Sequence, residues 1–497
     1  MADAHVAGQP CDLIIVGAGP AGLSAAETAL AHGLRVAVID EQHDVGGQIF
    51  RQPPASFRAP PVSAFETYPF GAGLLQRARA AKGIDWRFGT TAWGVFPQAE
   101  GEPLQVAISC ADSTEMIEGR HLLIATGAYD LPVAFPGWTL PGVMSAGGVQ
   151  TLVKSQFLRP GRRFVLAGSH PLLLLVADLL VRAGADVAEV AIARPMPRLA
   201  ELMSGVGAVP GHVGLLAETA RSLWNLRRRG VPLRFGTLVT RAQATADGER
   251  LCRVVLSDVD TEWRPKPGTE RTLEADTLVI GYGLLASTEL ARQAGCAAQW
   301  VPAGGGWIVR HDERMQTTVS KVYVAGEPAG VKGAELAWLE GRLAALNIVA
   351  ATDGDARLGQ LTPALQQTRS AIRQAHRFTD EVLRFFEPRL DALARLAIDD
   401  TLVCRCEEVT ASTVVRFLAA HPHVSDVSSV KLACRTGMGP CQGRYCQHTV
   451  AHLLADARGM PVAELGIFEA RAPVKPVSVR ALSNLSAPSG AGTRSAR

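Results

Sequence analysis

The stretch Asp12-Leu13-Ile14-Ile15-Val16-Gly17-Ala18-Gly19-Pro20-Ala21-Gly22 decides the fold of this chain. Its four apolar residues predict a buried strand, after which three glycines form the pattern G-x-G-x-x-G at the turn into a helix. The first glycine allows the tight turn, the second lets a pyrophosphate approach the backbone, and the third lets helix and strand pack closely. Because anions bind at helix N-termini, the stretch predicts a dinucleotide site.

The following segment completes this pattern. Gly33 is the predicted helix cap, and residues 36–39 predict a second buried strand that delivers Asp40, with Glu41 next. An acid about twenty residues beyond the glycines is where such folds hold a ribose hydroxyl. A lone G-x-G-x-x-G is a weak signal, because glycine clusters also mark ordinary turns. Here the strands, the glycines, the helix and the acid all fall at the spacing of a dinucleotide-binding fold, which favours a true dinucleotide site.

Composition bounds the size of the protein and excludes some partners. The chain has 497 residues, 47% of them apolar, which is enough for about three domains. Lys and Arg number 50 and Asp and Glu 47, so no charge excess favours nucleic acid or a membrane surface. The apolar run at residues 172–177 is too short to span a bilayer, and the N-terminal segment lacks the basic region of a signal peptide. We therefore expect a cytoplasmic protein without a transmembrane segment.

An internal repeat occupies the middle of the chain. Residues 163–173 align with the opening stretch, since Gly168 follows Gly17 by 151 positions and Gly184 follows Gly33 by 151. The chain therefore contains two nucleotide-type folds.

The second copy is degenerate. His170 and Leu173 stand in place of Gly19 and Gly22. Ala191 and Ile192 stand in place of Asp40 and Glu41. An imidazole at the pyrophosphate position and the loss of the ribose acid argue against ordinary NAD binding there. Arg194 is either a phosphate contact or a solvated loop cation. A secondary site for ATP or FMN stays open.

Three further motifs carry a resemblance. They are the loop Gly46-Gly47-Gln48, the strand end Ala125-Thr126-Gly127-Ala128 and the strand end Gly326-Glu327. With the opening fingerprint they resemble the flavoprotein family with two dinucleotide folds that includes glutathione and thioredoxin reductases, over about residues 10–350. The family more often has Asp at position 327, and its disulfide reductases carry a C-x-x-C or C-x4-C pair that these regions lack. Disulfide reduction is therefore not expected.

This resemblance implies FAD in the first domain. The residues that it implies for FAD binding are Gly17, Gly19, Pro20, Gly22, Asp40, Glu41, Gly47, Gln48, Thr126, Gly127, Gly326 and Glu327.

Five of the nine cysteines crowd into one C-terminal segment. Cys404 and Cys406 form a C-x-C pair, and Cys441 and Cys446 form a C-x4-C pair. Four thiolates suit either structural zinc or a 2Fe-2S cluster, but structural zinc prefers C-x2-C pairs and an upstream flavin makes electron transfer useful. The pattern therefore favours iron-sulfur ligation. Cys434 is a fifth thiol that a four-ligand site does not need, and ligand exchange with it stays open.

The cysteine segment narrows the resemblance. C-R-C-E-E-V at 404–409 and K-L-A-C-R-T-G-M-G-P-C-Q-G-R-Y-C at 431–446 resemble the bacterioferritin-associated-ferredoxin-like (BFD-like) 2Fe-2S domain. Fused behind a flavoprotein, this domain is similar to the alpha subunits of heteromeric FAD-dependent amine and imino-acid dehydrogenases. That group includes the corresponding subunits of hydrogen cyanide synthase, opine oxidase and D-hydroxyproline dehydrogenase. Its pattern usually has Thr at position 434.

The narrower resemblance implies an electron-relay role. A catalytic, FAD-containing, amine oxidase-like beta subunit would oxidise a CH-NH donor such as hydroxyproline, an opine, sarcosine or glycine, and a small ferredoxin-like gamma subunit is a further candidate partner. No catalytic residue is assigned to this chain. Two alternatives stay open: an NAD(P)H-dependent reductase that passes electrons through its cluster, and a zinc-stapled, non-catalytic assembly subunit.

The expected fold class is α/β, with two nested Rossmann-like domains and a small helical iron-sulfur domain. The expected domains are 1–150 (FAD-binding, first part), 151–290 (degenerate nucleotide fold), 291–352 (return to the FAD domain), 353–398 (helical linker), 399–472 (2Fe-2S domain) and 473–497 (disordered tail).

Overall fold

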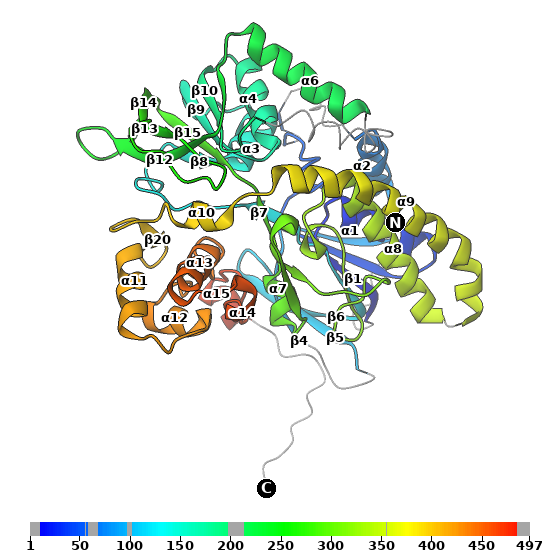
Figure 1. Ribbon diagram of the computed structural model, residues 1–497. Coiled ribbons are helices and arrows are strands. Elements are labelled where there is room, and N and C mark those ends of the chain that lie inside the picture. The colour runs from blue at the N-terminus through cyan, green and yellow to red at the C-terminus, as the bar shows by residue number, and fades with distance from the viewer. Residues whose placement is uncertain are drawn as a thin grey trace.

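The computed structural model describes residues 10–54, 56–57, 68–96, 102–196, 213–353 and 355–484. Two α/β units and a small helical C-terminal module lie around one long helix, as Figure 1 shows. The expected α/β class with two Rossmann-like folds and a helical C-terminal domain is confirmed.

The first unit is built on the opening stretch. β1 (Cys11–Val16), α1 (Pro20–Ala31) and β2 (Val36–Asp40) form the predicted strand-helix-strand, and β1 pairs with β2 in parallel. The sheet has the order β3-β2-β1-β6-β5-β4, and β19 pairs with β6. The other elements of this unit are β3 (Ile84–Phe88), β4 (Thr91–Phe96), β5 (Leu104–Cys110), β6 (Ser113–Ile124), β19 (Val322–Val324), α2 (Phe70–Ala80) and α8 (Ala334–Asp353).

Glycines set the close packing of this unit. A Cβ at Gly22 would lie 1.8 Å from the carbonyl oxygen of Gly17, so no larger residue fits between helix and loop. On α8, a Cβ at Gly341 would lie 2.0 Å from the carbonyl oxygen of Ala21. The third fingerprint glycine therefore has its predicted role, and α8 returns from far along the chain to cover α1.

The second unit repeats the first. β9 (Arg163–Gly168), α4 (Leu172–Arg182) and β10 (Asp186–Ile192) form the central part of an all-parallel sheet of order β11-β10-β9-β15-β8. An antiparallel sheet of three strands, β12-β13-β14, adjoins it. The other elements are β8 (Val143–Ser145), α3 (Ala146–Ser155), α6 (Val213–Arg228), β11 (Leu233–Phe235), β12 (Thr237–Ala244), β13 (Leu251–Asp258), β14 (Arg271–Glu274) and β15 (Thr277–Gly281).

The borders of the second unit differ from the expected 151–290. β8 already pairs with β15 at residues 143–145, and the second sheet ends with β15 at Gly281. The chain passes between the units through the antiparallel pair β7 (Ala128–Asp130) and β16 (Leu284–Ala286). α7 (Glu289–Gln293), β17 (Ala298–Val301) and β18 (Gly306–Val309) follow on the return.

The linker is mostly helical, as expected. α9 (Asp355–Phe386) packs along α8, and Ala375 shares a small buried cluster with Leu336 and Leu339. The C-terminal module then follows α10 and packs against the crossover strands and the second unit (Figure 1). Its elements are α10 (Leu390–Ala394), β20 (Leu402–Cys404), β21 (Val409–Thr410), α11 (Ala411–Ala420), α12 (Val427–Cys434), α13 (Gln447–Arg458) and α14 (Val462–Leu465).

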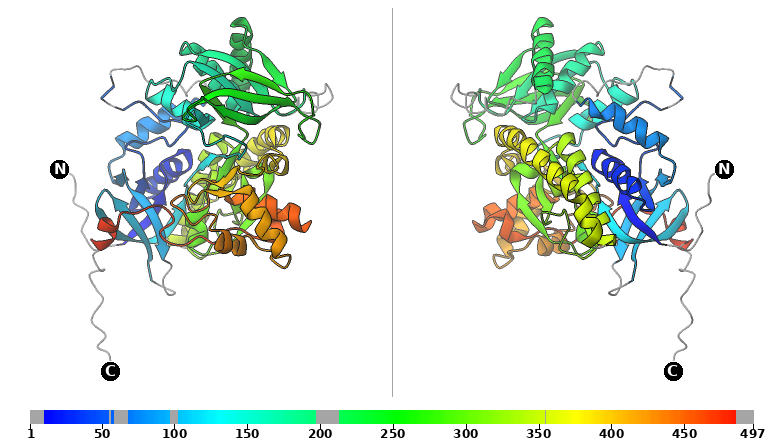
Figure 2. Two further views of the ribbon diagram at one scale, coloured as in Figure 1. Left: turned by 90° about the vertical axis from the view of Figure 1, so that its left-hand side faces the viewer. Right: turned by 90° about the vertical axis from the view of Figure 1, so that its right-hand side faces the viewer.

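The tail differs from its prediction. Residues 473–484 are folded against the first unit. They include α15 (Val479–Ser483), which lies near the sheet of the first unit in Figure 2. The Val474 amide donates to the Trp93 carbonyl at 2.9 Å, and Arg480 pairs with Asp112 at 3.3 Å. The tail as a whole is rich in Ser, Pro, Gly and Arg, but residues 473–484 contain three valines, and Val474 is inserted into the core of the first unit. Residues 485–497 lie outside the described part.

Among the described residues, no helix has the length and apolar character that a membrane crossing requires.

Candidate functional site

The glycine loop after β1 forms an open cradle. Gly17 has φ +112°, and a Cβ there would lie 2.2 Å from the Ala125 carbonyl oxygen. Beyond this contact the loop is open, because a Cβ at Gly19 would meet only the Gly47 Cα, at 4.0 Å. A Cβ at Gly127 would meet nothing within 4 Å. With Pro20 at the first position of α1, this arrangement leaves backbone accessible at a helix N-terminus, as a pyrophosphate requires.

The two predicted ribose acids have different surroundings. The Asp40 carboxylate accepts from the Ala18 amide at 2.5 Å and from the Gln42 amide at 2.7 Å, so it fixes the glycine loop. Burial raises the pKa of Asp40. Glu41 is paired with Lys475 from the tail, with 2.5 Å between Oε1 and Nζ. Sequence reasoning missed Lys475, because 434 residues separate it from Glu41.

The predicted flavin loops come together. Gln48 donates from Nε2 to the Ala128 carbonyl at 2.9 Å, which holds the Gly46-Gly47 loop beside the A-T-G-A strand end. Thr126 donates from its hydroxyl to the Ser287 carbonyl at 2.8 Å. The guanidinium Nε of Arg51 is buried in the same loop, and no described residue accepts a hydrogen bond from it. The open glycines and this orphaned donor fit a bound flavin nucleotide.

The Gly326-Glu327 strand end is held by a residue that sequence reasoning missed. Glu340 on α8 is buried, accepts from the Gly326 amide at 2.9 Å and lies 3.6 Å from the Lys332 ammonium. Burial raises the pKa of Glu327 to about 7, and the Glu340 carboxylate adds to the shift. No motif in the sequence marks Glu340, since its role follows only from the packing of α8.

The second nucleotide fold uses its own loop amides. The Ser169 and His170 amides both donate to the Gly281 carbonyl, at 3.1 and 3.0 Å. His170 also accepts from the Leu172 amide at 3.3 Å through Nδ1, so its side chain occupies the position where a phosphate would bind the helix. Burial lowers the pKa of His170 to about 4, which leaves it neutral at pH 7 and without charge for a phosphate.

Arg194 is not a solvated loop cation, and its contact with a phosphate stays a prediction. Its guanidinium lies 3.9 Å from the ring centroid of Phe385, and it donates to the Phe385 carbonyl near the end of α9. The linker helix is therefore fastened to the second fold through this arginine.

The four predicted metal-ligating cysteines converge as two pairs. Cys404 is the last residue of β20 and Cys446 precedes α13. Hydrogen bonding between their thiols lowers the pKa of Cys404 to about 6 and raises that of Cys446 well above its ordinary value. Cys406 and Cys441 form the second pair. Burial raises the pKa of Cys406, and hydrogen bonding with the Cys441 thiol adds to this. Each pair joins one cysteine of the C-x-C motif to one of the C-x4-C motif.

Backbone amides and glycines surround these thiols. The Gly437 amide hydrogen-bonds Cys404, and a Cβ at Gly439 would lie 2.4 Å from the Cys406 Cβ. Thr410 caps α11 by accepting from the Thr413 amide. For Cys434, burial alone raises the thiol pKa, with no contribution from another cysteine.

The donor set fits a two-iron cluster. A 2Fe-2S cluster takes four thiolates shared between two irons, whereas structural zinc takes four ligands at one centre. The four thiols lie close enough to shift one another's pKa, since Cys404, Cys406 and Cys441 all raise the pKa of Cys446, so they can serve together as one set of four ligands.

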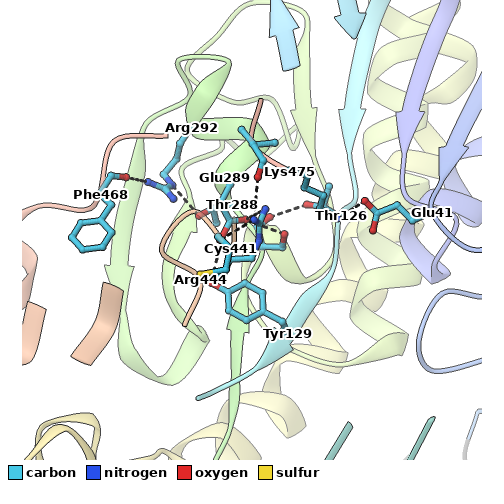
Figure 3. Close-up of polar contacts among 12 residues, drawn as sticks. Glu41, Thr126, Tyr129, Thr288, Glu289, Arg292, Cys441, Arg444, Phe468 and Lys475 are labelled. Carbon is cyan, nitrogen blue, oxygen red and sulfur yellow. Dashed lines mark hydrogen bonds and ion pairs between the residues drawn. The ribbon is translucent and has the colours of Figure 1, made fainter. Parts of the chain in front are cut away.

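A polar network joins the cysteine loop to the flavin loop (Figure 3). Arg444, between the two cysteines of C-x4-C, donates to the Cys441 carbonyl at 3.2 Å and lies 3.4 Å from the Glu289 carboxylate. Ser287 donates to Glu289 at 3.1 Å and accepts from Thr126 of the A-T-G-A segment. The two predicted cofactor sites are thus neighbours through one chain of contacts, which sequence spacing does not reveal.

Comparisons with known proteins agree with this architecture. The family model for pyridine nucleotide-disulphide oxidoreductases matches residues 11–374, and that for the BFD-like [2Fe-2S] binding domain matches residues 402–456. The chain is similar to the opine oxidase subunit designated A from Rhizobium meliloti (strain 1021), with 33% identity over 96% of this chain and 99% of the relative. It is also 33% identical to the HcnB subunit of hydrogen cyanide synthase from Pseudomonas aeruginosa, over 95% of this chain and 98% of the relative.

Solved structures confirm the fold. L-proline dehydrogenase from P. horikoshii superposes with a TM-score of 0.66 at 21% identity, over 95% of this chain and 79% of that chain. The two relatives above are named as subunits of an oxidase and a synthase, in agreement with the resemblance seen in the cysteine motifs. This chain belongs to the pyridine nucleotide-disulphide oxidoreductase family, as an FAD-dependent oxidoreductase with a C-terminal BFD-like 2Fe-2S domain.

Proposed function

We propose that this chain is the FAD and 2Fe-2S electron-transfer subunit of a heteromeric amine or imino-acid dehydrogenase. The observation that carries the proposal is the direct attachment of the cysteine loop to the flavin loop through Arg444, Glu289 and Ser287. A cluster site fastened beside a flavin site suits the passage of electrons between the two, because electron transfer needs proximity.

The chain's own residues hold the two groups. When bound, FAD supplies two-electron chemistry and the cluster supplies one-electron transfer. The open backbone at Gly19 would take the pyrophosphate at the start of α1, Gly17 and Gly22 allow the turn and the close packing there, and Asp40 fixes the loop. The four paired cysteines would ligate the cluster, and the Gly437 amide would face one of their sulfurs.

The second nucleotide fold favours this role over that of an NAD(P)H-dependent reductase. Its Ser169, His170 and Leu172 amides are already bonded within the chain, so a nicotinamide dinucleotide would have to displace them. The fold then has a structural use, since it carries the antiparallel sheet and core against which the C-terminal module packs.

The names of the relatives support the presence of a partner subunit. Opine oxidase and hydrogen cyanide synthase differ in the chemistry that their names describe, yet each contains a chain similar to this one. We therefore expect the substrate, a CH-NH donor such as hydroxyproline, an opine, sarcosine or glycine, to be oxidised on an FAD-containing, amine oxidase-like partner in the cytoplasm. A small ferredoxin-like protein is a further expected partner.

The test is to purify the chain alone and with its co-purifying partner. Alone, it should contain flavin, iron and acid-labile sulfide, and it should oxidise no amine. Full amine turnover without a partner would refute the proposal. Rapid bleaching of the flavin by NADH under anaerobic conditions would favour the reductase instead, and zinc in place of iron and sulfide would favour an assembly role.

A further inference from the structure

Three charged side chains meet at the junction between the flavin unit and the cysteine module. Glu289 and Arg444 form a buried ion pair, with side-chain exposures of 6% and 15%. The Glu289 carboxylate also accepts from the Tyr129 hydroxyl at 3.3 Å. Arg292 lies on the same helix one turn away, and the charges of Glu289 and Arg444 both act on it. The junction thus contains one carboxylate and two guanidinium groups in a site with little solvent.

The two arginines reach across the junction in opposite directions. Arg444 belongs to the cysteine module and faces Glu289 of the flavin unit. Arg292 belongs to the flavin unit and donates to the Phe468 carbonyl of the module, while its Nε donates to Thr288 at 3.2 Å. Figure 3 shows the two side chains on either side of Glu289.

Both arginines act on the cysteine loops. Arg444 lies between Cys441 and Cys446 and donates to the Cys441 carbonyl. The Phe468 ring, whose carbonyl binds Arg292, fills the space beside Gly437 and Gly443, where an added Cβ would lie 2.6 and 2.7 Å from the ring. The set therefore holds the loops that carry the thiols, and the Arg444 guanidinium reaches the backbone of one expected ligand, the Cys441 carbonyl at 3.2 Å.

The sign of this charge matters for a redox centre. One carboxylate and two guanidinium groups leave a net charge of about one positive unit, since arginine stays protonated in proteins. The Lys431 ammonium, on whose pKa Cys446 and Arg292 both act, adds a further positive charge near the same loops. Reduction of the cluster adds one electron and hence one negative charge. At a site with little water, a nearby positive charge stabilises the reduced form more than it would in bulk solvent.

We propose that Arg444, Glu289 and Arg292 are positioning residues that set the reduction potential of the 2Fe-2S cluster. This inference rests on the proposed function, because it requires a cluster at the paired cysteines. It adds that the electrostatic control lies at the flavin junction and belongs jointly to the two domains.

The experiment is a redox titration of the holoprotein with dithionite as reductant, followed by the electron paramagnetic resonance signal of the reduced cluster. Arg444→Gln should lower the potential, because it removes a positive charge. Glu289→Gln should raise it, because it removes the negative charge that offsets the arginines. The double variant should return toward the wild-type value, and Arg444→Lys, which keeps the charge, should stay near it.

A merely structural role predicts a different pattern, in which both single variants shift in the same direction or lose iron. Iron, sulfide and FAD are therefore measured in every preparation. If Arg444→Gln lost its cluster, its reduction potential could not be measured. The direction in which Glu289→Gln shifts the potential would then test the inference by itself. Loss of iron from Glu289→Gln, or a potential that is unchanged or lowered there, would overturn the inference.

A matched control comes from the same module. Arg471 pairs with Glu469 at 2.7 Å, but both side chains are exposed, at 78% and 67%. Arg471→Gln removes the same charge from a solvated site and should leave the potential unchanged, because water and salt screen it. Failure of the proposed function is distinguishable, since the wild-type chain would then contain no iron-sulfur cluster or would oxidise amine alone.

Discussion

Replacing Gly341 by Ala tests the close approach of α8 to α1, on which the whole flavin site depends. The added Cβ would lie 2.0 Å from the Ala21 carbonyl oxygen, and Cβ atoms do not come closer than 3.0 Å to such neighbours, so the two helices must separate by at least about 1 Å. α1 carries the phosphate-binding N-terminus, and α8 carries Glu340, which holds the Gly326 amide. The separation therefore disturbs both ends of the expected FAD site.

The expected loss of stability is measured against a control variant on the neighbouring helix α9. Overpacking a core costs about 1–3 kcal/mol, while Gly to Ala inside a helix returns up to about 1 kcal/mol. Gly359 on α9 is exposed, and a Cβ there would meet nothing within 4 Å, so Gly359→Ala gains helix propensity alone. The propensity term cancels between the two variants, and their difference isolates a packing cost of about 1–3 kcal/mol.

The assay is thermal release of FAD, followed by flavin fluorescence at one scan rate for both variants. In a unit of 150–250 residues, 1 kcal/mol corresponds to about 2–4 °C, so Gly341→Ala should release flavin about 2–12 °C below Gly359→Ala. Equal release temperatures, or a higher one for Gly341→Ala, would show that the helices do not touch as described.

Three further predictions concern the cysteines, a carboxyl group and the tail. Cys406→Ser should lose iron and sulfide and keep FAD, while Cys434→Ser should keep all three; metal analysis showing iron retained in the first variant would contradict the ligand assignment. Burial raises the pKa of Glu327 to about 7, so the folded apoprotein holds this proton more tightly than the unfolded chain does, and the stabilisation present below about pH 4.5 is lost as the pH rises through 7. Chemical denaturation between pH 5 and 8 should show this loss, and Glu327→Gln should flatten it; an unchanged slope would refute the cause. Val474→Asn places an amide in the flavin-domain core, where Val474 is 2% exposed, so trypsin should cut after Arg480 much faster than in wild type. Val479→Asn makes the same change on a side chain that is 82% exposed and should be cut near the wild-type rate; equal rates for the two variants would show that Val474 does not anchor the tail.

Much of the fold was predictable because its signals are local. The glycines of the fingerprint report steric needs within one turn, and the repeat from Gly17 to Gly168 exposes the second fold without any knowledge of contacts. Helix caps are equally local, as Thr410 shows. The borders of the second unit at residues 143 and 281 were harder to predict from the sequence, because strand β8 becomes part of the second sheet only through its pairing with β15.

The site was predicted in part, for the same reason. Spacing identifies Cys404 and Cys446 as candidate ligands, but it does not reveal that each C-x-C thiol faces a C-x4-C thiol. Glu340, Arg292 and Lys475 act on segments distant in sequence, and their residue types carry no motif. Composition also misled for residues 473–484, since one buried valine outweighs several polar neighbours.

These long-range contacts indicate how a flavoprotein fold acquires a second redox centre. The opening stretch has open backbone for a nucleotide, whereas the loop amides of the degenerate second copy are bonded to the Gly281 carbonyl and to the His170 side chain, and that unit serves as a support. The cysteine module packs against this second unit. Arg444 of the module pairs with Glu289 of the flavin unit, and Lys475 of the tail pairs with Glu41 of the flavin unit. Because Arg444 and Glu289 join the module to the flavin unit and are also the residues that we propose to set the cluster potential, we expect assembly of the module and its redox properties to depend on the same pair.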